Sequence, residues 1–168
     1  MTPDELLHHG HRSIRLPTRD YSALGIYYVT ICTEKKRCIL GRIENAQTNL
    51  TAVGKIVREY WLQIPSHFAN ACLHAFVIMP NHVHGLIEFV PGVEVRPNAQ
   101  TRRRVFDSTA VRPSPLSAIV RSFKAAVTKR ARIDLHFNGD VWQRNYFERV
   151  VRDGQEFSNA TRYIAENP

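Results

Sequence analysis

The chain has 168 residues, 43% of them hydrophobic, which is typical of one soluble globular domain with a substantial core. The sequence has no apolar run of the roughly 18 residues that a membrane-spanning helix needs. A formal net charge of +8 favours a polyanionic partner. Nucleic acid is preferred to acidic lipid as that partner.

Residues 1–20 are polar and basic and lack the apolar core of a signal peptide, so we expect a cytoplasmic protein. They form either a disordered tail or a flexible arm that lies along DNA phosphates, in which case Arg12 and Arg15 are candidate contacts. The three cysteines are Cys32, Cys38 and Cys72. Their spacing is not that of a metal knuckle, so we expect reduced thiols in the core.

The first half of the chain predicts two strands and a helix. Residues 26–33 are rich in β-branched and aromatic side chains, which indicates a strand. A polar turn at 34–37 leads to a second strand over 38–43, and the two strands should form an antiparallel hairpin. Apolar residues at helical spacing predict a helix over about 49–64, which Pro65 ends.

The middle of the chain predicts two further strands, over 73–79 and 82–90, joined at Pro80-Asn81. Residues 91–115 then form a loop longer than compact domains usually carry, so it is either disordered or functional. Its arginine run is either a solvated patch or a grip on the DNA backbone, and the candidate DNA contacts are Arg102, Arg103 and Arg104.

The last part of the chain predicts helix, strand and helix. Ser114-Pro115 is typical of an N-cap and first-turn proline, and the helix should run to about residue 133. One face of that helix is apolar and much of the remainder is basic, so Lys124 is a further candidate DNA contact. Residues 141–151 predict the fifth strand and residues 155–166 the last helix.

The predicted order is β-β-α-β-β-α-β-α. Helices placed between short, hairpin-linked strands favour an α+β fold with antiparallel pairing, formed by one domain over residues 21–168. The sequence carries neither a Walker loop nor a dinucleotide-binding glycine motif, which argues against nucleotide-driven chemistry.

His82 and His84 lie two residues apart in a predicted strand, so their side chains should project side by side from one face. Two adjacent imidazoles form half of a divalent-metal site. The alternative is two polar residues on a solvated strand face. The tight turn at Pro80-Asn81, directly before the pair, favours the metal site.

Tyr163 and Asn167 are four residues apart in the last predicted helix, so both should lie on one helical face. A phenol can break a phosphodiester without ATP by attacking phosphorus, if a cation neutralises the phosphate oxygens. Tyr163 is therefore the candidate nucleophile, and the Asn167 amide oxygen the candidate third ligand. The alternative for Tyr163 is a core aromatic, and Tyr146 is the rival nucleophile.

The stretch Met79-Pro80-Asn81-His82-Val83-His84-Gly85 resembles the HUH signature of the single-tyrosine transposases, including the REP-associated tyrosine transposases. Three further stretches match that family in its order along the chain, and they are 27–32, 141–147 and Tyr163-Ile164-x-x-Asn167-Pro168.

This resemblance implies a ferredoxin-like or RRM-like antiparallel sheet of about five strands with packed helices. It implies a divalent metal ion, Mg or Mn, and single-stranded or hairpin DNA as the partner. It also implies Tyr163 as the nucleophile that forms a 5′-phosphotyrosine and Asn167 as the third ligand. Relatives act as monomers or as homodimers.

Two other functions remain as alternatives. A non-catalytic RRM-like nucleic-acid-binding module should carry aromatic RNP signatures, and this sequence lacks them. That function would also leave His82 and His84 unexplained. A zinc hydrolase would require a third histidine or carboxylate at close spacing, which the sequence does not supply.

Overall fold

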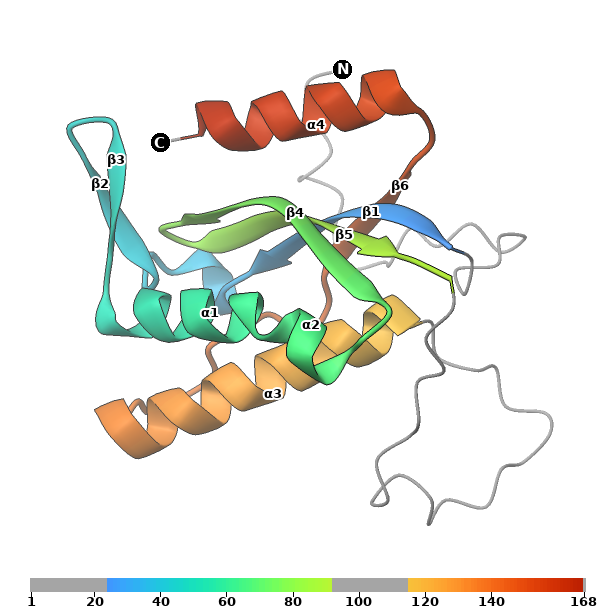
Figure 1. Ribbon diagram of the computed structural model, residues 1–168. Coiled ribbons are helices and arrows are strands. Elements are labelled where there is room, and N and C mark those ends of the chain that lie inside the picture. Colours follow the sequence, from blue (N-terminus) through green and yellow to red (C-terminus); the bar gives the residue numbers. More distant parts are fainter. Residues whose placement is uncertain (1–23, 92–114, 168) are drawn as a thin grey trace, which may run out of the picture.

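The computed structural model describes residues 24–91 and 115–167 (Figure 1). Several predictions lie outside these residues: the basic arm over 1–20 with Arg12 and Arg15, the long loop with Arg102, Arg103 and Arg104, and the N-cap at Ser114.

A four-stranded antiparallel sheet forms the centre of the fold, with the strand order β4-β5-β1-β6. With α1 and α3 as crossovers, the chain follows the β-α-β-β-α-β order of ferredoxin-like folds, so the predicted α+β class is confirmed. The strands are β1 (Gly25–Cys32), β4 (Ala71–Met79), β5 (His82–Phe89) and β6 (Phe147–Val151).

Helices cover both faces of this sheet (Figure 1). On one face lie α1 (Ala52–Leu62) and α3 (Pro115–Leu135), which pack on the sheet through the large core around Trp61 and Val57. On the other face lies α4 (Gly154–Glu166), which is anchored by a smaller cluster of four buried residues, Leu86, Val151, Ala160 and Ile164.

The predicted pairing of the second strand with the first is wrong. Strands β2 (Gly41–Glu44) and β3 (Gln47–Leu50) instead pair with each other in a separate two-stranded sheet. Their turn is Asn45-Ala46, where both residues have positive φ, as the tight turns of β-hairpins require. The chain between β1 and β2 holds the short helix η2 (Glu34–Lys36) and returns to the β4–β5 turn, where Leu40 N donates to Pro80 O at 2.9 Å.

Two element boundaries also differ from the sequence prediction. The first helix begins at Ala52, because the preceding residues pair within β3, and Thr51 caps it by accepting from Gly54 N. Pro65 does not end a helix but lies in the first turn of a second, short one, α2 (Ile64–His67).

The last strand is shorter than predicted, because β6 begins at Phe147 rather than at residue 141. In the preceding segment, the carbonyls of Gln143 and Asn145 accept from the Lys124 ammonium at 2.8 and 2.9 Å. These carbonyls are therefore committed to α3 rather than to a strand ladder. Trp142 makes only an isolated bridge, to Thr33.

The three cysteine thiols are free, but Cys38 and Cys72 are exposed, so the prediction of core thiols is wrong for these two. Within residues 24–91 and 115–167, no helix combines the length and the hydropathy that crossing a membrane demands.

Gly85 fixes the position of the His82–His84 strand over the core. A Cβ atom at Gly85 would lie 2.2 Å from Cζ2 of Trp61, which is fully buried and packs edge-to-face on Phe123 with ring centroids 5.4 Å apart. The indole thus lies directly beneath the strand that carries both histidines, and only glycine leaves room for it.

We expect Gly85→Ala to lower the free energy of unfolding by about 1–3 kcal/mol, because the added methyl must displace a close-packed indole. Gly154→Ala is the control: no atom lies within 4 Å of the added Cβ at this helix-start position. It should change stability by less than about 0.5 kcal/mol. Urea unfolding followed by tryptophan fluorescence measures both; equal stability of the two variants would contradict the packing argument.

Candidate active site

His82 and His84 lie on the sheet face that α4 covers. The register pairs them with Cys32 and Thr30 of β1. Their Nε2 atoms are 2.9 Å apart, and the rings meet at 73°. The strand therefore brings the two imidazoles together as alternation predicts.

The other nitrogen of each imidazole contacts oxygen atoms. His84 Nδ1 lies 2.8 Å from the Tyr28 hydroxyl and 2.9 Å from Thr30 Oγ1. His82 Nδ1 lies 2.6 Å from Asn81 Oδ1. A proton on each Nδ1 would be donated to these oxygens and would leave both Nε2 lone pairs available for a cation, the usual arrangement around metal-bound histidines.

Tyr28 and Thr30 were missed as site residues by sequence reasoning. Their i, i+2 spacing in β1 places both on the His84 side of the sheet, and this spacing was the available signal. Identifying His84 as their partner requires the β1–β5 register, in which Thr30 is directly opposite His84.

Burial controls the charge of this cluster. His84 is only 5% exposed, and burial, with a further effect of His82, lowers its pKa to about 3. The imidazole is therefore neutral near pH 7, the form in which it binds metals. Burial also raises the pKa of the Tyr28 phenol, as does the nearby Tyr163, so the Tyr28 hydroxyl keeps its proton.

Stability should depend on pH through His84. With a pKa of about 3 folded and 6.5 as the ordinary value, the unfolded chain binds one more proton between these two values. The free energy of unfolding should therefore decrease as the pH falls from 6.5 toward 3, by up to about 1.4 kcal/mol per pH unit from this residue.

Urea unfolding at pH 7 and pH 5 in metal-free buffer measures this dependence. His84→Gln should remove much of the decrease. The control variant His67→Gln, at an exposed position on α2, should retain it. An identical pH dependence in His84→Gln and the wild type would contradict a buried neutral His84.

Tyr163 reaches the histidines from α4. Its ring packs edge-to-face on the His84 ring, with centroids 5.5 Å apart. The neighbouring Ile164 is buried in the cluster that anchors α4 to the sheet, which sets the orientation of this helix face. The structure thus brings together three of the residues singled out in the sequence.

Asn167 is the C-cap of α4, and its Nδ2 donates to the carbonyl of Tyr163 at 2.5 Å. Because the amide nitrogen is used for this bond, Oδ1 is the atom left to act as an acceptor or ligand. Its role as a third metal ligand stays a prediction.

Tyr146 and Lys124 lie elsewhere. Tyr146 packs against the large core on the α1 and α3 side, with the Lys124 ammonium 5.9 Å from its ring centroid. Burial lowers the pKa of Lys124 to about 8, and its ammonium donates to two backbone carbonyls. Contact of Lys124 with DNA stays a prediction.

The distance between the two Nε2 atoms is compatible with two adjacent ligands of an octahedral cation. Two adjacent ligands at about 2.1 Å from such an ion lie about 3.0 Å apart, close to the 2.9 Å between the two Nε2 atoms. Residues 24–91 and 115–167 contain no group of three His, Cys, Asp or Glu that could hold a metal. The nearby Glu148 pairs with Val29 in the register, so it points to the opposite sheet face from His84. Among the described residues, a third protein ligand would therefore have to be an amide, carbonyl or hydroxyl oxygen.

Two solved structures with a similar fold are a transposase and a candidate transposase. A REP-associated tyrosine transposase bound to a REP hairpin has a TM-score of 0.59 at 16% identity, covering 92% of this chain and 73% of that one. A candidate transposase from Deinococcus radiodurans R1 has a TM-score of 0.50 at 17% identity, covering 91% and 98%. The fold is therefore transposase-like.

No family model matches this sequence. An uncharacterized protein of Haemophilus influenzae is 40% identical over 161 residues, which cover 95% of this chain and 89% of the relative. The chain belongs to the same family as this Haemophilus protein.

Proposed function

We propose that this protein is a metal-dependent HUH single-tyrosine transposase that nicks and rejoins single-stranded DNA, with a DNA hairpin as its target. One observation carries the proposal: Tyr163 packs on His84, which faces His82, although the tyrosine is separated from the histidines by most of the second half of the chain. The transposase-like fold supports it. So does the solved neighbour, which is bound to a REP hairpin.

His82 Nε2, His84 Nε2 and Asn167 Oδ1 are the atoms that would hold a divalent cation, Mg or Mn. Such a cation would neutralise negative charge on the phosphate oxygens. The residues around it have separate tasks: Tyr28, Thr30 and Asn81 hold the imidazoles by their Nδ1 atoms, and α4 presents the phenol beside them.

Tyr163 is the nucleophile on this proposal. Its Oη attacks phosphorus and loses its proton, the bond from phosphorus to the 3′ oxygen breaks, and that oxygen leaves as a hydroxyl after taking up a proton. The 5′ phosphate stays on the tyrosine, so the bond energy is retained and the 3′ hydroxyl of a strand can reverse the step. Tyr28 is unsuited to this role, because its hydroxyl is engaged with His84 and burial raises its pKa.

The contact between Tyr163 and His84 lies within one chain. This supports an active site that a monomer completes by itself. A homodimer stays a prediction, as does the cytoplasmic location.

Tyr163→Phe should abolish the covalent protein–DNA adduct. The substitution removes one oxygen and retains the ring that packs on His84, so the protein should remain folded and should still bind DNA. The assay is a denaturing gel of an end-labelled single-stranded hairpin oligonucleotide incubated with manganese or magnesium. Tyr146→Phe is the matched control and should form the adduct largely as the wild type does.

An adduct that persists in Tyr163→Phe and disappears in Tyr146→Phe would transfer the nucleophile to Tyr146. If wild-type protein binds the oligonucleotide and never forms an adduct, the alternative of a non-catalytic binding module is correct.

His82→Ala and His84→Ala should each abolish cleavage while leaving hairpin binding nearly intact, since affinity for DNA comes chiefly from phosphate contacts. Electron paramagnetic resonance of Mn²⁺ should show loss of ion binding in both variants. Tyr28→Phe combined with Thr30→Val keeps both imidazoles and removes the two oxygens at His84 Nδ1. It should weaken Mn²⁺ binding about 10- to 100-fold. Wild-type cleavage in both histidine variants would show that the metal site is elsewhere.

A further inference from the structure

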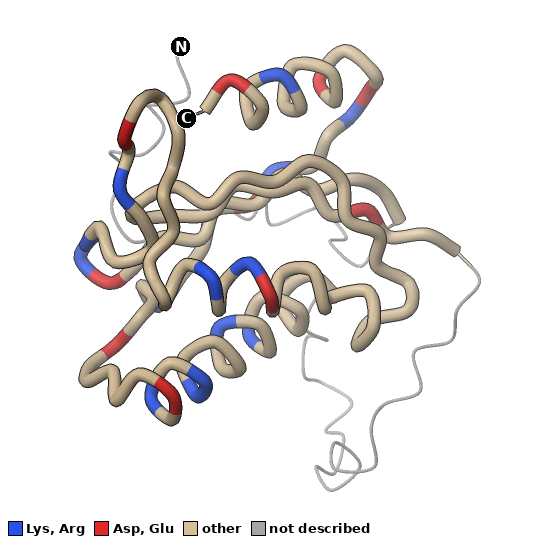
Figure 2. The backbone as a smooth tube through the Cα atoms, turned by 60° about the vertical axis from the view of Figure 1, so that its left-hand side comes forward, with Lys and Arg blue, Asp and Glu red and all other residues tan. Residues whose placement is uncertain are grey.

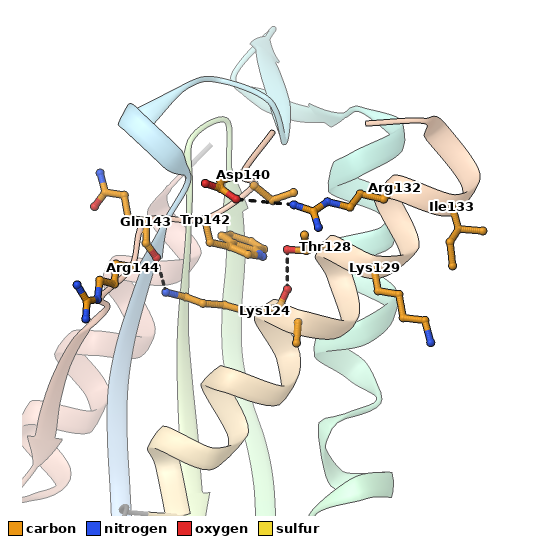
Figure 3. A pocket seen from close by; sticks show the side chains of 11 residues that line it. Lys124, Thr128, Lys129, Arg132, Ile133, Asp140, Trp142, Gln143 and Arg144 are labelled. Atoms are coloured by element: carbon orange, nitrogen blue, oxygen red, sulfur yellow. Dashed lines mark hydrogen bonds and ion pairs between the residues drawn. The ribbon is translucent and has the colours of Figure 1, made fainter. Parts of the chain in front are cut away.

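A basic groove lies between α3 and the segment that follows it, on the sheet side away from α4 (Figure 3). Its volume is about 640 Å³. Four cationic side chains line it against a single carboxylate, that of Asp140, and they are Lys124, Lys129, Arg132 and Arg144.

We infer that this groove binds the phosphates of the DNA strand that leads to the active site, an inference that rests on the proposed function. Three cationic side chains are exposed and open to a ligand, those of Lys129, Arg132 and Arg144. Figure 3 shows that they come from both walls, with Lys129 and Arg132 on α3 and Arg144 on the facing segment. Cations on two sides of a groove suit a linear polyanion better than a single small anion.

The charge is a property of the α3 surface. Figure 2 shows Lys and Arg repeated along this helix, which carries one acidic residue, Asp134. Asp134 is paired with Arg130 at 2.6 Å, outside the groove, so it does not offset the groove cations. Inside the groove, Asp140 lies 3.8 Å from Arg132, and this exposed pair is weak.

The groove is long enough for more than one phosphate. Its α3 wall extends from Lys124 to Ile133, a distance of about 14 Å at the helical rise of ~1.5 Å per residue. An extended single strand spaces its phosphates more widely than the ~3.4 Å axial rise per strand of B-form DNA. The wall is thus long enough for about two consecutive phosphates.

The groove is also close to the histidine pair. Gln143, in its far wall, donates its backbone N–H to Cys32 O at 3.0 Å, and Cys32 pairs with His82. Two strand spacings, about 10 Å in all, therefore separate this wall from the first histidine. A strand held in the groove can pass around the end of β1 to the face that carries His82 and Tyr163.

Lys124 holds the two walls together. Its ammonium, on α3, donates to the carbonyls of Gln143 and Asn145 in the facing segment. Substituting Lys124 would therefore disturb the groove itself, so the test below leaves this residue unchanged.

The test is DNA binding by the full chain across a salt series, with fluorescence anisotropy of a labelled single-stranded oligonucleotide. We expect the triple variant Lys129→Gln/Arg132→Gln/Arg144→Gln to bind severalfold more weakly. Its slope of log affinity against log salt concentration should be smaller by about 0.7 for each phosphate that the variant no longer neutralises. The single variant Arg130→Gln removes one charge from the same helix outside the groove and should retain the wild-type slope.

Asp140→Asn provides a test of opposite sign. Removing the groove carboxylate should tighten binding, whereas a purely structural role of this segment predicts no gain in affinity. The backbone carbonyl of Asp140, which accepts from Arg37 at 2.6 Å, is unchanged by the substitution.

The outcomes separate this inference from the proposed function. At saturating DNA the triple variant should still form the Tyr163 adduct, because the groove cations do not touch the reacting atoms. A wild-type slope and affinity in the triple variant, with the adduct still formed, would overturn the groove alone. If the triple variant has a reduced slope but the wild type forms no adduct, the groove would be supported and the catalytic proposal overturned. Absence of DNA binding by the wild type would overturn both.

Discussion

The antiparallel pairing of β1 with β5 is the constraint on which the candidate site depends. It places Thr30 directly opposite His84 and brings the Tyr28 hydroxyl to the same ring nitrogen. Because side chains alternate between faces, a slip of one residue would turn both histidines into the large core and leave their polar atoms buried without these partners. The register is thus fixed by apolar burial on one face and by hydrogen bonding on the other.

The same strand satisfies two opposite demands. On the core face, Gly85 admits the Trp61 indole, and on the other face His84 meets Tyr163. The strand backbone cannot move toward α1 without a clash between Gly85 and Trp61, so close packing on the core face fixes the position of the His84 imidazole. A rigid strand that presents candidate ligands above a fully packed core suits chemistry in which small displacements are costly.

Local patterns predicted much of this structure. Alternation placed His82 and His84 on one face, helical spacing placed Tyr163 on a helix, and the order of elements indicated an α+β fold. The errors came from non-local choices. Residues 38–43 read as a partner for β1, but the positive-φ turn at Asn45-Ala46 pairs β2 with β3 instead.

The contacts that hold the imidazoles and shorten β6 could not be predicted from the sequence, because they also depend on non-local pairing. Tyr28 and Thr30 can be assigned to His84 only when the register between strands distant in the sequence is known. The shortened β6 depends on a lysine of α3 that takes the carbonyls of Gln143 and Asn145. Sequence periodicity describes what one element buries, and it does not specify which side chain of another element will compete for its backbone.

The unequal anchoring of the helices has a consequence for motion. Among the described residues, twenty-two buried ones make up the cluster that includes α1 and α3, whereas the cluster between α4 and the sheet has four, with partly buried side chains around them. Separating α4 from the sheet therefore exposes less apolar surface than separating α1 and α3 would, and such a local opening costs less free energy than global unfolding. The segment that carries the candidate nucleophile is thus held by fewer buried residues than the helices on the opposite face, while the imidazoles belong to the sheet itself. A phosphate attached to Tyr163 could travel with its helix, and the two halves of the site could separate and rejoin without loss of the core.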